Sequence, residues 1–351
     1  MAAQPITLVT GGAGHLGGNL VRALLARGQE RVRCIIRSGS NNQALEGLGV
    51  ELVEADLRDD AAVEAAVAGV DYVYHLAAFV SIRHGDRKNL FDVNIEGSKR
   101  LMQACLAAGV KRVVYCSSFG AVRNVAPAPC TEASTFSPYE ETTDYEVSKG
   151  FAEGEVLRIA AQGLDVVVVN PSGIIGGHDY KPSLTGQSIL EFAAGNIRAY
   201  PTGGFDFVHV DSVVDGCLAA MERGKTGERY LLTGEWVAMK TVFEWLAEFT
   251  GRPAPWLCVP GSVMIPFVRA KDWIERTFFP DVLPRFNENS IRLLNCGKWA
   301  DHSKAERELG VVFKPTKDAF RDAVAWFIEV GAIKAPSGYT PPPGYSLPSK
   351  L

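Results

Sequence analysis

The chain has 351 residues, a formal net charge of −4 and a hydrophobic fraction of 47%. These values predict a globular protein of about two domains, and the acidic balance argues against nucleic acid as a partner. Seven scattered cysteines without C-x-x-C spacing are typical of reduced thiols in a cytoplasmic protein without a metal site. No apolar run approaches the ~18 residues that a membrane span needs, so no transmembrane segment is expected.

A glycine-rich loop near the N-terminus lies between a short strand, predicted over 6–9, and a helix, predicted over 19–28. Its spacing is Gly-x-x-Gly-x-x-Gly, through Gly11, Gly14 and Gly17. Glycine allows a tight reversal, a close approach of backbone to a ligand, and close packing of helix on strand. The free N–H groups at the start of the helix suit a pyrophosphate. The loop therefore predicts a dinucleotide site.

Short apolar strands alternate with helices from residue 5 to about 170. Val166–Val169 is apolar on both faces, which is typical of a parallel strand covered by helices on each side. The pattern predicts a doubly wound parallel α/β sheet of the Rossmann type. The predicted strands are Ile6–Val9, Val32–Ile36, Glu51–Glu54, Tyr72–Leu76, Arg112–Cys116 and Val166–Val169. Helices are predicted over 60–68, 94–108 (closed by Gly109), 211–222, 240–250 and 301–309.

The alternation breaks after Pro171, where a segment rich in glycine, proline and polar residues begins, and a strand returns over 207–210. We expect a smaller interleaved α/β domain to lie over the carboxyl ends of the strands and to hold the substrate. The expected parts are a Rossmann domain (1–171 and 206–233), a substrate domain (172–205 and 234–330) and an extended proline-rich tail (331–351).

Two charged residues follow the second and third strands. Arg37 stands where an acidic residue would bind the 2′-hydroxyl of an adenosine ribose. A cation there would attract a 2′-phosphate, which favours NADP(H) over NAD(H); a solvated loop arginine is the alternative. Asp56, before Leu57, could accept a hydrogen bond from the adenine amino group, or it could cap the helix that starts at Asp60.

Tyr145 and Lys149 are four residues apart in a predicted helix, so they share one face. A tyrosine with a pKa near ~10 is a poor proton shuttle at neutral pH, and a nearby lysine cation can favour the phenolate. Such pairs are common by chance. Here the pair follows the fifth strand, whose carboxyl end carries Ser117 and Ser118, so we predict a catalytic site.

In these features the sequence resembles the extended short-chain dehydrogenases/reductases of the NAD(P)-dependent epimerase/dehydratase superfamily, over roughly residues 5–330. Its details resemble dihydroflavonol-reductase-like and 3β-hydroxysteroid-dehydrogenase-like members, and also a hopanoid-associated sugar epimerase group. The matching pieces are Thr10–Gly17, Asp56-Leu57, His75–Ala78, Val93–Gly97, Ser117-Ser118, Tyr145 with Lys149, Asn170–Gly176, Phe207–Asp211 and Asp301–Ala305.

The resemblance implies that Ser118 polarises the reacting oxygen, with Ser117 as the alternative. It implies that Tyr145 exchanges a proton and that Lys149 lowers the pKa of Tyr145 and holds the nicotinamide ribose. It also implies that Pro171 and Ile174 flank the nicotinamide. The full set of expected cofactor contacts is Gly11, Gly14, His15, Leu16, Gly17, Arg37, Asp56, Leu57, Ala77, Tyr145, Lys149, Pro171 and Ile174.

Two departures from the sugar-modifying members bear on the substrate. Asn170 precedes Pro171 where epimerases commonly have arginine, and Phe205 stands where they place an arginine against the substrate pyrophosphate. A charged substrate would lose strong hydrogen bonds there. We therefore expect a small apolar carbonyl or alcohol, such as a steroid, a flavonoid or a long-chain compound, in a pocket walled by Phe205 and a helix over 263–279.

The predicted helix over 263–279 places Phe267, Ala270, Ile274 and Phe278 on one stripe. The stripe is typical of a core helix, or of a lid over an apolar substrate. His178 could be a catalytic histidine of the cleft, although a loop histidine is the more ordinary interpretation.

Three functions follow from these patterns. The first is NADP(H)-dependent reduction of a ketone or oxidation of a secondary alcohol on an apolar substrate. The second is epimerisation or dehydration of a nucleotide-sugar with the same three residues. The third, a non-catalytic NADP(H) sensor, is disfavoured because a binding module does not need a proton shuttle. A homodimer is a further expectation, and the substrate itself is not determined.

Overall fold

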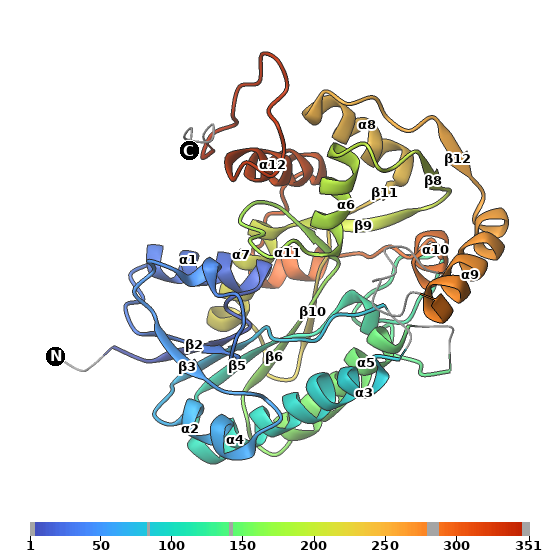
Figure 1. Cartoon of the computed structure of the whole chain (residues 1–351). Coiled ribbons are helices and arrows are strands. Elements are labelled where there is room, and N and C mark those ends of the chain that lie inside the picture. The colour runs from blue at the N-terminus through green and yellow to red at the C-terminus, as the bar shows by residue number, and fades with distance from the viewer. Residues whose placement is uncertain (1–3, 83–84, 140–142, 279–287, 346–351) are drawn as a thin grey trace.

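The computed structural model of the protein describes residues 4–82, 85–139, 143–278 and 288–345 (Figure 1). Within these residues, seven parallel strands form one sheet in the order β10-β6-β5-β4-β1-β2-β3. All six residues of β6 are buried, because helices cover both faces of the sheet. The strands are β1 (Thr7–Thr10), β2 (Val32–Ile36), β3 (Glu51–Glu54), β4 (Tyr72–His75), β5 (Arg112–Cys116), β6 (Val166–Pro171) and β10 (Arg229–Leu232).

The sheet is the expected doubly wound fold, and the six expected strands are all present. Their apolar side chains divide between two cores, one on each face. The first face is covered by α1 (His15–Ala26), α7 (Val210–Arg223) and α11 (Ser303–Leu309) (Figure 1). The second is covered by α2 (Asp60–Val67), α4 (Ser98–Ala108) and α5 (Asp144–Ala160). Gly109 ends α4 at φ 70°, as expected for a glycine C-cap. The remaining short elements of this region are η1 (Gln43–Leu45), α3 (Arg87–Leu90), the π-helix η2 (Phe91–Gly97) and η3 (Phe119–Ala121).

A second group of elements lies beyond the carboxyl ends of the main strands (Figure 1). Its three-stranded sheet has the order β11-β9-β7, and β8 pairs with β12. A third apolar core joins this sheet to α6, α8 and α12. The elements are β7 (Gly173–Ile175), α6 (Leu184–Ala193), β8 (Ala199–Pro201), β9 (Gly204–His209), β11 (Glu235–Ala238), α8 (Met239–Thr250), β12 (Leu257–Val259), α9 (Gly261–Phe278), α10 (Glu288–Asn295) and α12 (Thr316–Glu329). The exact domain boundaries stay a prediction.

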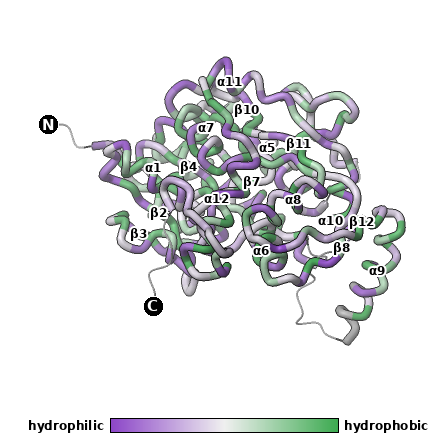
Figure 2. Tube along the Cα trace, turned by 90° about the horizontal axis from the view of Figure 1, so that it is seen from above, coloured by the Kyte–Doolittle hydropathy of each residue, from purple (hydrophilic) through white to green (hydrophobic). Residues whose placement is uncertain are grey.

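Helix α9 lies at the edge of the molecule (Figure 2). The side chains of Phe267 and Ile274 are 72% and 45% exposed, and Ala270 is also exposed. The core-helix interpretation is therefore wrong for these residues, because the described part of α9 buries only Gly261 and Val268. The side chain of Phe278 lies outside the described residues. None of the described helices is long and apolar enough to cross a membrane.

The described part of the proline-rich tail packs onto the third core. Ala335, Tyr339 and Tyr345 are partly buried against it, and the hydroxyl of Tyr345 lies beside Gly177. The expectation of a tail that is only extended is therefore incomplete. The rings of Tyr339 and Tyr345 supply the apolar surface through which this part of the tail packs.

Candidate active site

The glycine loop is packed so closely that side chains are excluded at Gly11 and Gly17. Gly11 has φ +73°, and a Cβ there would lie 2.8 Å from the backbone nitrogen of Ala77. A Cβ on Gly17 would collide with the carbonyl oxygen of Gly11, and Gly14 N donates to the same oxygen at 2.9 Å. The loop between β1 and α1 is thus a cradle of bare backbone, into which a pyrophosphate fits.

Helix α1 begins after Gly14 without a side-chain cap and without an acidic residue in its first turn. Its first N–H groups therefore favour an anion. Leu16 is buried in the first core. His15 Nε2 lies 3.0 Å from the carbonyl oxygen of Gly177, to which Asn19 Nδ2 also donates at 3.1 Å. These contacts hold the loop after β7 against the cradle, and burial lowers the pKa of His15.

At the adenosine end, Arg37 is exposed after β2 and Asp56 follows β3. The carboxylate of Asp56 receives Arg58 Nε at 2.9 Å and Arg58 Nη2 at 2.6 Å. The hydrogen bonds from Arg58 lower the pKa of Asp56 to about 2, and the charge of Arg37 contributes. The capping alternative for Asp56 is wrong, because Asp59 caps α2 through its side chain. Two cations therefore stand at this end of the site.

A buried asparagine in the matching piece Val93–Gly97, to which the sequence analysis gave no role, holds the loop after β4. Asn94, in η2, donates to the carbonyl oxygen of Phe79 at 2.9 Å and accepts from Phe79 N at 2.7 Å. It also donates to Ser148 Oγ at 2.9 Å. Asn94 thus joins the loop that carries Ala77 to α5. The π-helical turn of η2 fits a functional site, where such turns often occur.

The structure brings Tyr145 and Ser118 together. Helix α5 begins with a capping box between Thr143 and Glu146, which places Tyr145 in its first turn. The side chain of Tyr145 lies close enough to Ser118 for Ser118 to lower its pKa against the effect of burial, and Ser118 Oγ accepts from Gly120 N at 3.0 Å. Ser117 points elsewhere: its Oγ donates to Glu153 at 2.5 Å. This geometry favours Ser118 over Ser117 as the partner of Tyr145.

Lys149 is buried one turn after Tyr145, but its contacts are with β5. Lys149 Nζ lies 3.1 Å from Tyr115 Oη and donates to the carbonyl oxygen of Cys116 at 2.8 Å. Burial lowers the pKa of Lys149 to about 8. Burial also raises the pKa of Tyr145 above its ordinary value, and the nearby hydroxyl of Ser118 opposes that rise. The protein's own groups therefore do not produce the expected depression of the pKa of Tyr145.

The end of β6 supplies the opposite wall. Pro171 is buried and Ile174 is partly buried in the adjoining β7. Asn170 Nδ2 donates to the carbonyl oxygen of Ser118 at 3.1 Å and to Glu153 Oε2 at 2.8 Å. Asn170 Oδ1 is buried, and within the described residues it has no hydrogen-bond partner. An unused acceptor here fits the amide N–H of a nicotinamide, as the bare cradle fits the pyrophosphate.

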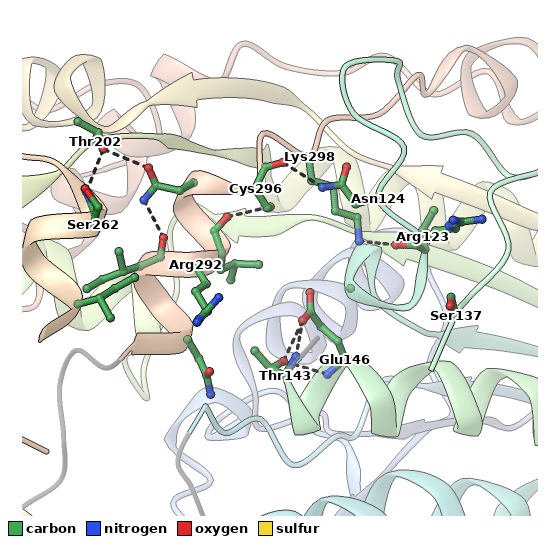
Figure 3. Close-up of a pocket in the computed structure, with 18 of the residues that line it drawn as sticks. Arg123, Asn124, Ser137, Thr143, Glu146, Thr202, Ser262, Arg292, Cys296 and Lys298 are labelled. Carbon is green, nitrogen blue, oxygen red and sulfur yellow. Dashed lines mark hydrogen bonds between the residues drawn. The ribbon is translucent and has the colours of Figure 1, made fainter. Parts of the chain in front are cut away.

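A cavity of about 1010 Å³ borders the first turn of α5 and the loop after β5 (Figure 3). Gly120 and Glu146 form part of its wall, whereas Ser118 and Tyr145 are not among its described lining residues. The described lining includes Ile265 of α9 but not Phe205, which packs against Phe207 at a ring distance of 5.3 Å. The expected wall at Phe205 is therefore absent from the described lining. Apolar lining residues are Val122, Phe136, Pro260, Ile265, Ile291 and Leu293, and basic ones are Arg123, Arg292 and Lys298.

His178 does not lie with this pair. Its φ is 58°, and its ring packs 4.9 Å from the ring of Trp326 in α12. The loop interpretation of this histidine fits its aromatic contacts, and burial lowers its pKa.

Comparison with known proteins identifies the family of this chain. The model of the "NAD dependent epimerase/dehydratase family" matches residues 7–232. "Sterol demethylase protein B" of Methylococcus capsulatus is 53% identical over 327 residues, covering 93% of this chain and 99% of that protein. A "3beta-hydroxysteroid-dehydrogenase/decarboxylase isoform 2" of Arabidopsis thaliana is 27% identical over 363 residues, covering 93% of this chain and 62% of that protein.

Among solved structures, the crystal structure of gox2253 superposes with a TM-score of 0.82 at 35% identity, covering 94% of this chain and 99% of that chain. The match extends over the main sheet and over the elements beyond its carboxyl edge. The chain therefore belongs to the NAD dependent epimerase/dehydratase family of extended short-chain dehydrogenases/reductases and is an NAD(P)-dependent enzyme.

Proposed function

We propose that this protein is an NADP(H)-dependent oxidoreductase that interconverts the 3β-hydroxyl group of a sterol and the corresponding ketone. The observation that carries the proposal is the placement of Tyr145 beside Ser118, in the first turn of α5, which borders a large, partly apolar cavity. The names of two relatives, a sterol demethylase protein and a 3β-hydroxysteroid dehydrogenase/decarboxylase, support this substrate class.

In the oxidising direction, the substrate oxygen would bind between Ser118 and Tyr145. Ser118 would donate a hydrogen bond to that oxygen, and Tyr145 would take its proton. Hydride transfer is the chemistry that a bound nicotinamide supplies. Positive charge from Lys149 and from the oxidised ring would favour the phenolate of Tyr145, which the protein alone leaves with a raised pKa.

The residues that would hold the cofactor run along the carboxyl edge of the sheet. The cradle and the start of α1 would take the pyrophosphate, and Lys149 would take the nicotinamide ribose. Arg37, with Arg58 nearby, would take a 2′-phosphate, which favours NADP(H). The proposed contact residues are Gly11, Gly14, His15, Leu16, Gly17, Arg37, Asp56, Leu57, Ala77, Tyr145, Lys149, Pro171 and Ile174.

The cavity suits a sterol in size and lining. Ligand pockets of roughly 300–1,000 Å³ take drug-sized molecules, and this cavity is at the upper end of that range. Its basic residues are Arg123, Arg292, which pairs with Glu288, and Lys298, which donates to the carbonyl oxygens of Phe119 and Val122; their positive charge would favour a carboxyl group on the ring system. Oxidation of a hydroxyl group beside such a carboxyl gives a β-keto acid, which readily loses carbon dioxide. A 4-carboxysterol is therefore the form of substrate to test first.

The experiment follows NADPH absorbance with NADP⁺ and 3β-hydroxysterols, with and without a 4-carboxyl group. Tyr145→Phe should lower turnover by about 10²–10⁴-fold, because general acid–base catalysis is lost, and should retain NADPH affinity. Tyr139→Phe is the matched control, because Tyr139 is 96% exposed. Ordinary turnover by Tyr145→Phe would refute the proposed role.

The competing function is epimerisation or dehydration of a nucleotide-sugar. It uses the same residues but produces no net change in NADPH. Calorimetry with UDP- and dTDP-sugars on the NADP(H)-loaded protein separates the two. Micromolar binding of a nucleotide-sugar, together with no oxidation of sterols, would overturn the proposed function.

A further inference from the structure

Glu153 is a buried carboxylate on the same face of α5 as the two expected catalytic residues. It follows Lys149 by one turn and Tyr145 by two, at the four-residue spacing that aligns side chains on a helix. Its side chain is 6% exposed. Its oxygens accept three hydrogen bonds: from Arg229 Nη1 at 2.9 Å, Ser117 Oγ at 2.5 Å and Asn170 Nδ2 at 2.8 Å.

Two of these contacts control the backbone around Ser118. Ser117 precedes Ser118 at the end of β5. Asn170, at the end of β6, donates both to Glu153 and to the carbonyl oxygen of Ser118. Glu153 therefore joins the ends of two neighbouring strands, β5 and β6, around Ser118.

The third contact brings a cation from β10. The Arg229 side chain is 15% exposed and also donates to the carbonyl oxygen of Glu132 at 2.6 Å. A buried ion pair is weak evidence for stability, because removing both charges from water costs about as much as their attraction returns. Because Glu153 also contacts Ser117 and Asn170 at the ends of β5 and β6, its pairing with Arg229 indicates a role in the active site.

That role concerns the charge of Lys149, whose ammonium is also buried. Glu153 is a carboxylate that favours this ammonium, while burial opposes it. The other titratable groups around Lys149 are phenols, a thiol and an imidazole, which are neutral near pH 7 when buried. The groups that act on it are Tyr115 and Cys116 of β5, His75 of β4 and Glu153 of α5, with Arg229 of β10 paired to Glu153; Tyr145 lies one helical turn before it on α5.

We propose that the Glu153–Arg229 pair is a positioning unit of the active site: the carboxylate of Glu153 fixes the strand ends around Ser118 and keeps Lys149 charged. This inference rests on the proposed function for the role of Lys149 in holding the cofactor ribose. It makes two separable claims, because length and charge of the side chain at position 153 can be changed independently.

Glu153→Gln retains the length and removes the charge. We expect Lys149 to lose its proton at a lower pH in this variant. NADPH affinity, measured by fluorescence titration from pH 6 to 10, should then fall with a midpoint about one pH unit below that of the parent protein. This titration needs no sterol, so it can fail or succeed independently of the proposed substrate.

Glu153→Asp retains the charge and shortens the side chain by one methylene. Its titration midpoint should match that of the parent, whereas kcat for sterol oxidation should fall by about 10²-fold, because Ser117 and Asn170 lose their common acceptor. Glu155→Gln is the control, since it removes a surface carboxylate of α5 that pairs with Arg158. It should change neither readout.

Arg229→Gln provides a test of opposite sign. Without the cation, the charge of Glu153 acts more strongly on Lys149, so the NADPH midpoint should move to a higher pH than in the parent. If Glu153→Gln fails to fold, this variant carries the charge claim alone. Parental midpoints in both charge variants would overturn the charge claim, and a parental kcat in Glu153→Asp would overturn the positioning claim.

Discussion

Burial of Lys149 makes stability depend on pH in a direction that can be measured. Its pKa falls from an ordinary 10.5 to about 8 in the folded protein. Below pH 8 the Lys149 side chain is charged in both the folded and the unfolded protein, so the folded protein carries the full cost of burying a charged ammonium. Between pH 8 and 10.5 the unfolded state binds more protons, so the free energy of unfolding rises with pH through this contribution. The difference amounts to about 3 kcal/mol.

The perturbation is Lys149→Met, which removes the titrating group and retains an unbranched side chain. Urea unfolding of the parent and the variant should be measured from pH 7 to 10.5. Other buried thiols and phenols titrate in this range in both proteins, so the informative quantity is the parent free energy of unfolding minus that of the variant. This difference should increase by about 3 kcal/mol over the range.

The matched control is Lys240→Met, because the Lys240 side chain is 73% exposed on α8. The free energy of unfolding of the parent minus that of Lys240→Met should stay nearly constant with pH. If the same difference for Lys149→Met were also constant, burial would not disfavour the charged form of Lys149. The reasoning about burial and charge at the site would then be refuted.

Three further predictions concern the cofactor site and its support. Arg37→Asp should reduce NADPH affinity by about ten- to a hundredfold relative to NADH, measured by fluorescence titration, and equal affinities in the parent would contradict it. Gly17→Ala should abolish tight NADPH binding, because the added Cβ would collide with the carbonyl oxygen of Gly11. Gly154→Ala is the control, because no atom lies near the position of its Cβ in α5. This variant should bind NADPH normally and gain about 0.5–1 kcal/mol in free energy of unfolding. Asn94→Ala should lower the free energy of unfolding by about 1–3 kcal/mol for each buried polar group that it leaves unpaired. The control, Asn196→Ala at an exposed position, should change the free energy of unfolding by less than about 0.5 kcal/mol. Equal effects of the two substitutions would refute the role of Asn94.

Much of the fold could be predicted because its signals are local. Apolar β-branched runs such as Val166–Val169 can be buried on both faces only in a covered parallel sheet. The glycine loop and the Gly109 cap are likewise set by backbone sterics within a few residues. Tyr145 and Lys149 share a face because the helix period decides it.

Other features depend on contacts between distant segments, and local patterns misjudged them. The apolar stripe of α9 has the period of a core helix, yet Phe267 is exposed, because no other described element covers that face. Asp56 was misjudged for a local reason: Arg58, two residues later, takes its carboxylate, and Asp59 caps the helix instead. Phe205 was expected to line the substrate pocket. Its direction depends on how β9 pairs with β7 and β11, and the sequence alone does not give this register.

By itself, then, the sequence determined the sheet, the cradle and the helix face that Tyr145 and Lys149 share, because backbone sterics and the periods of helix and strand act over a few residues. Only the tertiary structure decided which serine meets Tyr145, that Lys149 contacts Tyr115 and Cys116, and that Glu153 joins Arg229. Those outcomes require strand ends and a helix, separated by tens of residues, to meet in a buried space where each polar group must find a partner. Pairing of this kind is a property of the folded chain, and no spacing along the sequence encodes it.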